Sequence, residues 1–87
     1  MLTVIHTFNG SDADRILGEV RSGIESVETI NGFKFASVNI QENTSDIMLF
    51  SKWDNLSAYE SWSDTVGENN AFKSATPQIF EVLEEKY

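Results

Sequence analysis

His6 is the one side chain of this sequence whose ordinary pKa lies near neutrality. A side chain with that pKa can accept a proton and return it at physiological pH, so His6 is the natural candidate for a general base. The alternative is a structural role, in which a strand histidine is half exposed at a subunit seam or hydrogen-bonded to a neighbour. No partner for His6 is evident from the sequence, and both interpretations stay open.

Three aromatic residues are candidates for a ligand-binding slot. Tyr59 and Trp62 are spaced to share one face of a helix, and Phe72 follows on the next turn. Such rings can line a flat slot between a helix and a sheet and bind a planar ligand. The same spacing is typical of core packing, which is the alternative for all three residues. Trp53, at the end of a strand pattern, is expected to lie in the core.

Composition excludes several other kinds of chemistry. The chain has no cysteine and one histidine, which excludes disulfides and multi-histidine or thiolate zinc sites. It carries 14 acidic against 6 basic residues, a net charge of −8, which disfavours nucleic acid and anionic membranes as partners. The N-terminal residues lack a secretory signal pattern, and no apolar run is long enough for a membrane span. We therefore expect a cytoplasmic protein.

The first half of the sequence predicts a strand, a helix and a second strand. Residues 2–8 are rich in β-branched and aromatic types and end at Asn9-Gly10, which predicts a strand with His6 on the same face as Leu2, Val4 and Phe8. A helix is expected over 12–27, because acidic residues occupy its first turn and its apolar residues fall within an arc of roughly 100°. Asn31-Gly32 then interrupts the chain, and the alternation over 33–41 predicts a strand.

The second half repeats this order from strand to helix to strand. Residues 47–53 follow a short polar connection, which predicts an antiparallel hairpin with the preceding strand. Asp54 or Asn55 is expected to cap a second helix, since either side chain can accept a backbone N–H of the first turn. A short helical turn over 71–76 and a last strand over 79–85 complete the pattern, with a helix as the alternative for the last segment.

The predicted fold is α+β and ferredoxin-like, with the order βαββαβ in one domain over residues 1–87. It has a four-stranded antiparallel sheet with both helices on one face. Both sides of the third strand are apolar, with Ile47 and Leu49 on one side and Met48 and Phe50 on the other. Two helices can cover only one face, so the second face is expected to pack against a second copy of the chain in a homodimer.

The stretch from Trp53 to Trp62, WDNLSAYESW, resembles the W-x-S-x-x-A-[FY]-x-x-W signature of the antibiotic biosynthesis monooxygenase superfamily. The segments ETINGF, residues 28–33, and NAFKSA, residues 70–75, resemble the same superfamily. The resemblance covers nearly the whole chain and implies a dimeric α+β barrel, in agreement with the fold predicted from the residues.

The resemblance does not extend to the functional residues of the haem-degrading branch. That branch uses an asparagine on its first strand, a tryptophan and an axial histidine. Trp62 matches the tryptophan, but the asparagine position falls on or beside His6 and the histidine position falls on Thr76. Because a threonine hydroxyl is a poor ligand for haem iron, haem binding or degradation is kept only as a third alternative, and no cofactor is expected.

The remaining branch implies oxygenation of an electron-rich phenol or enol without metal or flavin. That reaction requires a base, an aromatic slot and the exclusion of water. The resemblance therefore implies His6 and Trp62 as catalytic residues, and Tyr59, Phe72 and Thr76 as binding residues for a small aromatic or quinol-like molecule. The alternative is a non-catalytic ligand-binding or stress-related dimer that uses the same pocket.

Overall fold

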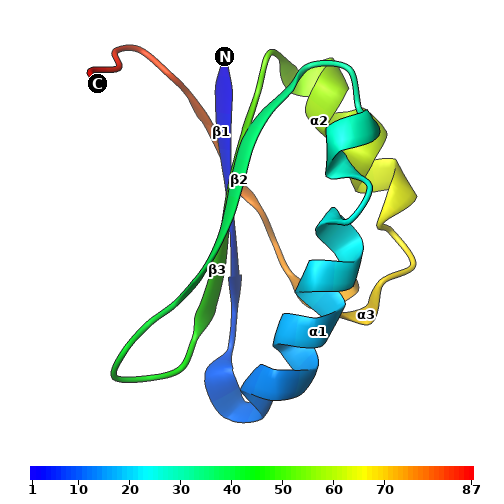
Figure 1. Cartoon of the computed structure of the whole chain (residues 1–87), viewed down its shortest axis with the longest axis vertical. Helices are drawn as coiled ribbons and strands as arrows, with labels where there is room; N and C mark the ends of the chain where they lie inside the picture. The colour runs from blue at the N-terminus through cyan, green and yellow to red at the C-terminus, as the bar shows by residue number, and fades with distance from the viewer.

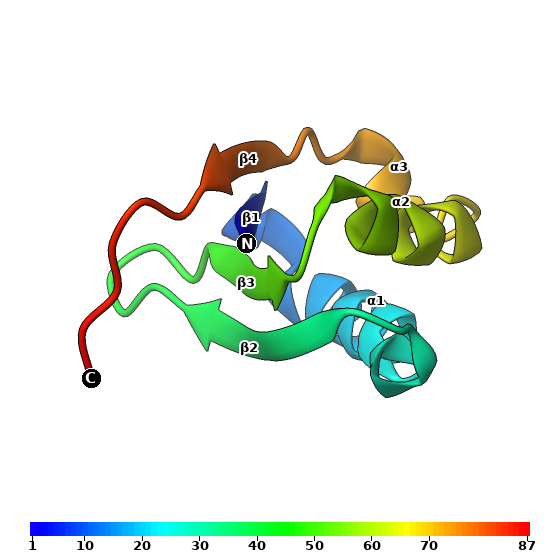
Figure 2. The ribbon, with the colours of Figure 1, turned by 90° about the horizontal axis from the view of Figure 1, so that it is seen from above.

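The computed structural model describes all residues, 1–87, and shows a sheet covered by helices on one face (Figures 1 and 2). The four strands are antiparallel in the order β2-β3-β1-β4. This confirms the predicted ferredoxin-like fold. The elements in chain order are β1 Leu2–Phe8, a 3-10 turn Gly10–Asp12, α1 Ala13–Ile24, a 3-10 turn Val27–Thr29, β2 Phe33–Ile40, β3 Ile47–Trp53, α2 Leu56–Thr65, α3 Asn70–Ser74 and β4 Gln78–Glu81.

The largest differences from the prediction are at the ends of two elements. The first helix ends at Ile24 and not near residue 27, because Val27–Thr29 turn in a separate 3-10 segment. The last strand is β4, Gln78–Glu81, and not 79–85. The last residue pair between β4 and β1 is Glu81 with Leu2. Beyond it β1 has only Met1 left, whose carbonyl accepts the amide of Val82 at 2.9 Å. The helix alternative for this segment is wrong.

The start of α2 is fixed by two contacts. The Oδ1 atom of Asn55 accepts the amide of Ala58 at 2.9 Å, so Asn55 and not Asp54 is the cap. Gly32 lies against the same turn with φ +99°, a conformation that favours glycine, and an added Cβ there would lie 2.7 Å from that of Ala58. The Asn31-Gly32 turn thus brings the entry to β2 close to the first turn of α2.

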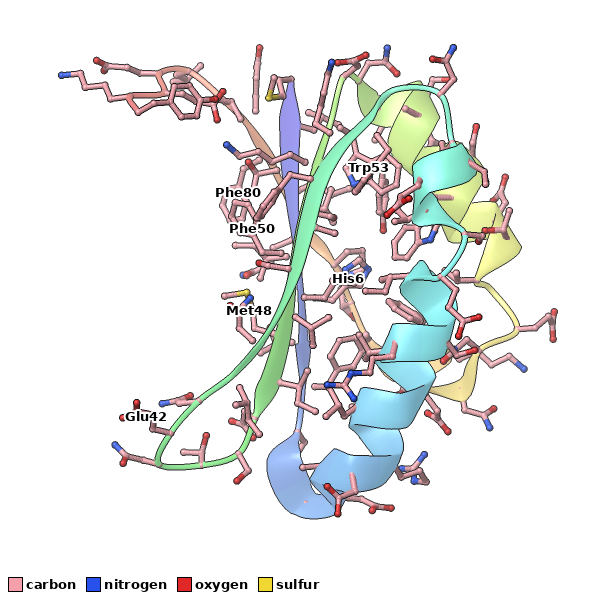
Figure 3. All side chains as sticks on the ribbon, viewed as in Figure 1. His6, Glu42, Met48, Phe50, Trp53 and Phe80 are labelled. Atoms are coloured by element: carbon pink, nitrogen blue, oxygen red, sulfur yellow. The ribbon has the colours of Figure 1, made fainter.

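The core lies between the sheet and the helices. Alternate residues of β1 and β3 point into it, among them Val4, Leu49 and Trp53, all fully buried. Ser51 is buried with them, and its hydroxyl accepts the indole N–H of Trp53 at 3.0 Å. Figure 3 shows Trp53 and His6 on the side of the sheet that faces the helices. The expectation that Trp53 is a core residue is confirmed.

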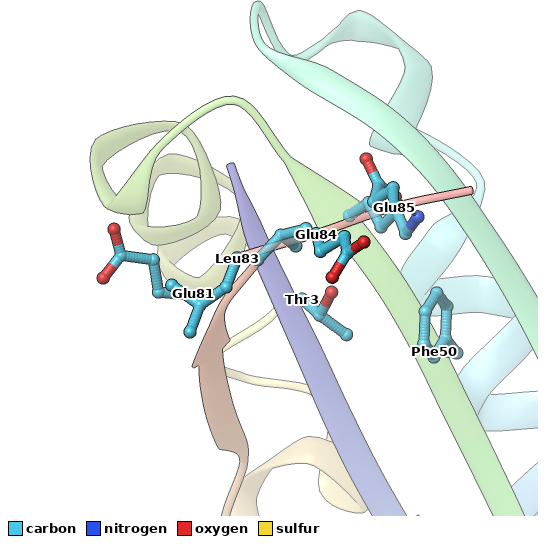
Figure 4. A pocket seen from close by; sticks show the side chains of 8 residues that line it. Thr3, Phe50, Glu81, Leu83, Glu84 and Glu85 are labelled. Atoms are coloured by element: carbon cyan, nitrogen blue, oxygen red, sulfur yellow. Dashed lines mark hydrogen bonds and ion pairs between the residues drawn. The ribbon is translucent and has the colours of Figure 1, made fainter.

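The opposite face of the sheet has no helices over it. Figure 3 shows Met48, Phe50 and Phe80 pointing away from the helical layer. Phe80 keeps 48% of its surface exposed. The C-terminal tail, residues 82–87, crosses one end of this face, where Lys52 and Glu85 form an ion pair. A surface pocket of about 520 Å³ lies under this crossing (Figure 4).

Candidate functional site

His6 lies in the helix-facing layer and is surrounded by aromatic rings. It is 3% exposed, and its ring centroid lies 5.3 Å from that of Phe72, 6.0 Å from Trp62, and 6.2 Å from both Tyr59 and Phe8. We call these five residues the His6 cluster. Four of them, all except Phe8, were site candidates from the sequence, and the structure brings those four together.

Each member of the cluster is placed by the periodicity of its element. His6 and Phe8 alternate on the buried face of β1. Tyr59 and Trp62, three residues apart, share the buried face of α2, which the cap at Asn55 holds in place. Phe72 comes from α3, a helix of five residues. The site is therefore built from β1, near the start of the sequence, and from α2 and α3, which follow each other in its second half.

The polar contacts of His6 are few. Its Nε2 lies 3.4 Å from the hydroxyl of Tyr59, while its Nδ1 is buried without a partner. Burial without a compensating charge lowers the pKa of His6 from 6.5 to about 4. The ring is therefore neutral at physiological pH. In the tautomer that donates its Nε2–H to Tyr59, the Nδ1 atom is a free acceptor for the hydroxyl of a ligand.

Tyr59 has two polar neighbours in the structure, His6 and Ser63. Burial raises the pKa of Tyr59, and its hydrogen bond with Ser63 opposes that shift. The phenol is therefore protonated at neutral pH and serves as a hydrogen-bonding group. The contact between the Tyr59 hydroxyl and Nε2 of His6 orients the imidazole. Tyr59 is therefore a positioning residue as well as part of the wall of the cluster.

The indole N–H of Trp62 is hydrogen-bonded within the protein. It donates to the carbonyl of Gly23 on α1 at 3.1 Å, and the side chain is 1% exposed. A Cβ on Gly23 would lie 2.5 Å from the ring of Phe72. Gly23 thus lets both Trp62 and Phe72 approach α1. Sequence reasoning did not name Gly23, although a glycine near the end of an otherwise apolar helix face was the available signal.

Thr76, the remaining site candidate, is not brought into the cluster. It follows α3 and is exposed, whereas His6, Tyr59 and Trp62 are buried. It lines none of the four surface pockets. Phe8, by contrast, belongs to the cluster and was noted in the sequence only as sharing a strand face with His6.

The predicted aromatic slot is filled by its own side chains. The rings of Trp62 and Phe72 are 5.4 Å apart edge to face, and those of Trp53 and Trp62 are 5.6 Å apart. Neither His6 nor Trp62 lines any of the four surface pockets. In this conformation the cluster is closed, and a ligand can reach His6 only if a ring moves.

The structure contains no group of three or more histidine, cysteine, aspartate or glutamate side chains placed to hold a metal ion. Its helices are too short or too polar to cross a membrane. Two acidic residues, Asp12 and Glu19, form ion pairs with Arg15 at 2.7 and 3.0 Å. The chemistry that the site can offer is therefore that of a neutral imidazole among aromatic rings.

Comparison with known proteins gives the fold. No family model and no curated protein matches the sequence. Among solved structures, a "putative antibiotic biosynthesis monooxygenase" from Nitrosomonas europaea superposes with TM-score 0.79 at 10% identity, over 97% of this chain and 100% of that one. A protein described in the same words from Deinococcus radiodurans has TM-score 0.75 at 15% identity, over 100% of this chain and 97% of that one. SnoaB, a cofactor-independent oxygenase from Streptomyces nogalater, has TM-score 0.79 at 9% identity, over 97% of this chain and 94% of that one.

The chain has the fold of the antibiotic biosynthesis monooxygenases. The resemblance drawn from WDNLSAYESW is thereby confirmed at the level of the fold, and this stretch forms the end of β3 and most of α2, as expected. Sequence identities of 9 to 15% to these monooxygenase structures describe architecture and leave the activity to be argued from the site.

Proposed function

We propose that this protein is a cofactor-independent monooxygenase that acts on a small aromatic or quinol-like molecule at the His6 cluster. The observation that carries the proposal is the buried, neutral imidazole of His6, whose Nδ1 has no partner although aromatic rings surround it. A buried polar atom without a partner is costly, and a ligand hydroxyl would satisfy it. The fold shared with SnoaB supports the same class of reaction.

The proposed reaction begins with a proton transfer inside the cluster. A bound quinol donates its hydroxyl proton to Nδ1 of His6, which gives an imidazolium beside an electron-rich phenolate. The pKa of His6 near 4 makes it a weak base in the free protein. The new ion pair offsets that weakness, because opposite charges attract strongly in a site without water.

The substrate itself supplies the electrons for oxygen. The phenolate reacts with dioxygen at a ring carbon, one oxygen atom enters the product as a ring hydroxyl while the two quinol oxygens become carbonyls, and the other oxygen atom leaves as water with the two hydrogens removed from the substrate. The balance is one quinol and one dioxygen giving one hydroxyquinone and one water. In this scheme Tyr59 orients His6, while Trp62 and Phe72 stack on the substrate and exclude water. Thr76 has only the resemblance in favour of a binding role.

A second candidate function is favoured by the closed cluster. A non-catalytic dimer that binds an aromatic ligand needs the same rings and no proton transfer, and the filled slot at Trp62 and Phe72 is compatible with it. This function predicts that aromatic ligands raise the melting temperature without consuming oxygen.

We also propose that the protein is a homodimer that buries the open face of the sheet. Phe35 is 50% exposed and Phe80 is 48% exposed on that face, and Phe35 stacks edge to face with Phe50. Monomers seldom expose so many large apolar side chains on one surface. Neither nucleic acid nor a membrane is a proposed partner, in keeping with the net charge of −8.

The two functions are separated by measuring oxygen consumption and melting temperature on the same samples. Reduced quinols and anthrones are added to the purified protein under air, with the rate of uncatalysed oxidation subtracted. Oxygen uptake above that rate supports the monooxygenase. A raised melting temperature with no enzymatic uptake for any compound would instead support the ligand-binding dimer.

A further inference from the structure

One surface pocket shares a wall with the His6 cluster. It has a volume of about 380 Å³ and lies between the end of β1, the first turns of α1 and the end of α3. Phe8 and Ile16 form its apolar side, and Arg15 and Ser74 lie on its polar side. We call it the α1–α3 pocket. Its volume lies within the range of small-molecule sites.

Phe8 connects this pocket with the His6 cluster. Phe8 is one of the residues that line the pocket, and its ring is nearly parallel to that of His6, at an interplanar angle of 6°. Phe72 lies edge to face with both, 5.6 Å from Phe8 and 5.3 Å from His6. The pocket and the imidazole are thus linked by ring contacts through Phe8, against which Phe72 packs.

Phe72 is the more easily displaced of these two rings. Phe72 is only partly buried, and the helix that carries it, α3, is five residues long. This short helix lies beside α1 (Figure 1). A helix of this length has little stability of its own. Asn69 holds it through the amide of Ala71 at 3.0 Å and the carbonyl of Glu19 at 2.8 Å. Phe8, in contrast, belongs to a strand paired along its length with β3.

The charges around the pocket indicate the kind of ligand. Arg15 contacts both Asp12 and Glu19, so its positive charge is already balanced. The pocket therefore offers hydrogen-bonding groups and no unpaired cation for an anionic ligand. A planar, uncharged phenol fits this combination of an apolar wall and a polar rim better than a carboxylate or phosphate does.

We propose that the α1–α3 pocket is the entry site for an uncharged, hydroxylated aromatic ligand, and that displacement of Phe72 on α3 admits this ligand to His6. The inference rests on the proposed function for the identity of the interior site. To that function it adds the route by which the substrate enters and the requirement that the substrate be uncharged.

Amide NMR spectroscopy of the whole chain, titrated with catechol, tests the entry site without requiring turnover. We expect the amides of Phe8, Ile16 and Ser74 to shift, together with the ring signals of His6. Cyclohexanol, which is similar in size but not planar, is the ligand control. Absence of shifts, or shifts confined to the pocket beside Phe50 on the open face, would overturn the proposal.

Two variants test the route itself. Ser74→Trp places a large side chain at an exposed position of the pocket rim and should weaken catechol binding about tenfold or more. Ser61→Trp, at an exposed position of α2 outside the pocket, is the matched control and should leave the affinity unchanged. Phe72→Leu should speed association of catechol, because leucine is smaller than phenylalanine and obstructs the path to His6 less. Equal affinities in the two tryptophan variants would contradict the route.

The outcome is distinct from that of the proposed function. Catechol binding at this pocket without any oxygen uptake would overturn the monooxygenase and leave the entry site intact. Oxygen uptake unaffected by Ser74→Trp would overturn the entry site and leave the monooxygenase intact.

Discussion

The Nε2 atom of His6 lies 3.4 Å from the hydroxyl of Tyr59, and the other ring nitrogen is buried with no partner. This pair joins β1 to α2 through the middle of the aromatic layer. No carboxylate hydrogen-bonds to the imidazole, so no opposite charge in the free protein stabilises its charged form. Both the stability of the fold and the proposed reaction depend on this neutral ring.

The first prediction concerns acid stability. The pKa of His6 is about 4 in the folded protein and 6.5 ordinarily, so the unfolded chain binds this proton more tightly. The stabilisation from the neutral ring is complete above pH 6.5 and is lost as the pH falls from there through 4. The loss amounts to at most about 3.5 kcal/mol, since the pKa differs by about 2.5 units and each unit is worth about 1.4 kcal/mol.

Urea unfolding of the wild type and of His6→Phe at pH 7 and pH 4 measures this effect. Carboxylates titrate alike in both proteins, so the difference between the two isolates His6. We expect the wild type to lose more stability than the variant on acidification. A parallel loss in both proteins would show that the imidazole is not the group responsible.

The second prediction concerns the contact between Gly23 and Phe72. Gly23→Ala places a Cβ 2.5 Å from the ring of Phe72, and overpacking of this kind costs about 1 to 3 kcal/mol. Gly18 is the matched control, because it lies in the same helix and has no atom within 4 Å of an added Cβ. Gly18→Ala should stabilise the protein by up to about 1 kcal/mol through helix propensity. Equal stabilisation by both substitutions, measured in urea, would refute the close contact.

The third prediction concerns the cap of α2. Asn55→Ala removes the acceptor for the amide of Ala58 and should cost about 1 kcal/mol of the free energy of unfolding. Asp54→Ala removes only an ion pair with Lys34, in which both side chains are nearly half exposed, and should cost less than about 0.5 kcal/mol. Chemical denaturation of the two variants compares the adjacent positions directly. A larger loss in Asp54→Ala would reverse the assignment of the cap.

The fourth prediction concerns the open face. Sedimentation at micromolar concentration should give twice the chain mass of 9.8 kDa for the wild type. Phe80→Asp should shift the protein toward the monomer, because it places a charge on the buried apolar surface of the dimer. Leu56→Glu, at a 47% exposed position of α2 on the other side of the molecule, should leave the dimer intact. A wild type that sediments as a monomer would contradict the proposed dimer.

Local patterns in the sequence were enough to predict most of the fold. The alternation over residues 2–8 put Val4, His6 and Phe8 on one face, and β1 has that arrangement. The end of β4 could not be predicted from its own residues, because it depends on where its partner strand begins. Leu2 pairs with Glu81, and beyond that pair only the carbonyl of Met1 is left to hold the chain.

Four of the five members of the His6 cluster could be predicted from the sequence, but the packing among them could not. Periodicity placed Tyr59 and Trp62 on one helix face, but it could not show that Phe72 would close the space between them and His6. That closure depends on the absence of a side chain at Gly23, a contact between residues 49 positions apart. Thr76 was named by position in a resembled motif, and its exposure depends on where α3 ends.

Oxygen consumption by the wild type and by His6→Phe tests the central claim most directly. Phenylalanine keeps a ring among the aromatic neighbours and removes both nitrogens, so the fold, checked by its melting temperature, should persist. With a quinol that the wild type oxidises, we predict that uptake in His6→Phe falls to the uncatalysed rate, while Ser61→Ala, outside the cluster, retains the wild-type rate. Uptake by a folded His6→Phe at the wild-type rate would contradict the account.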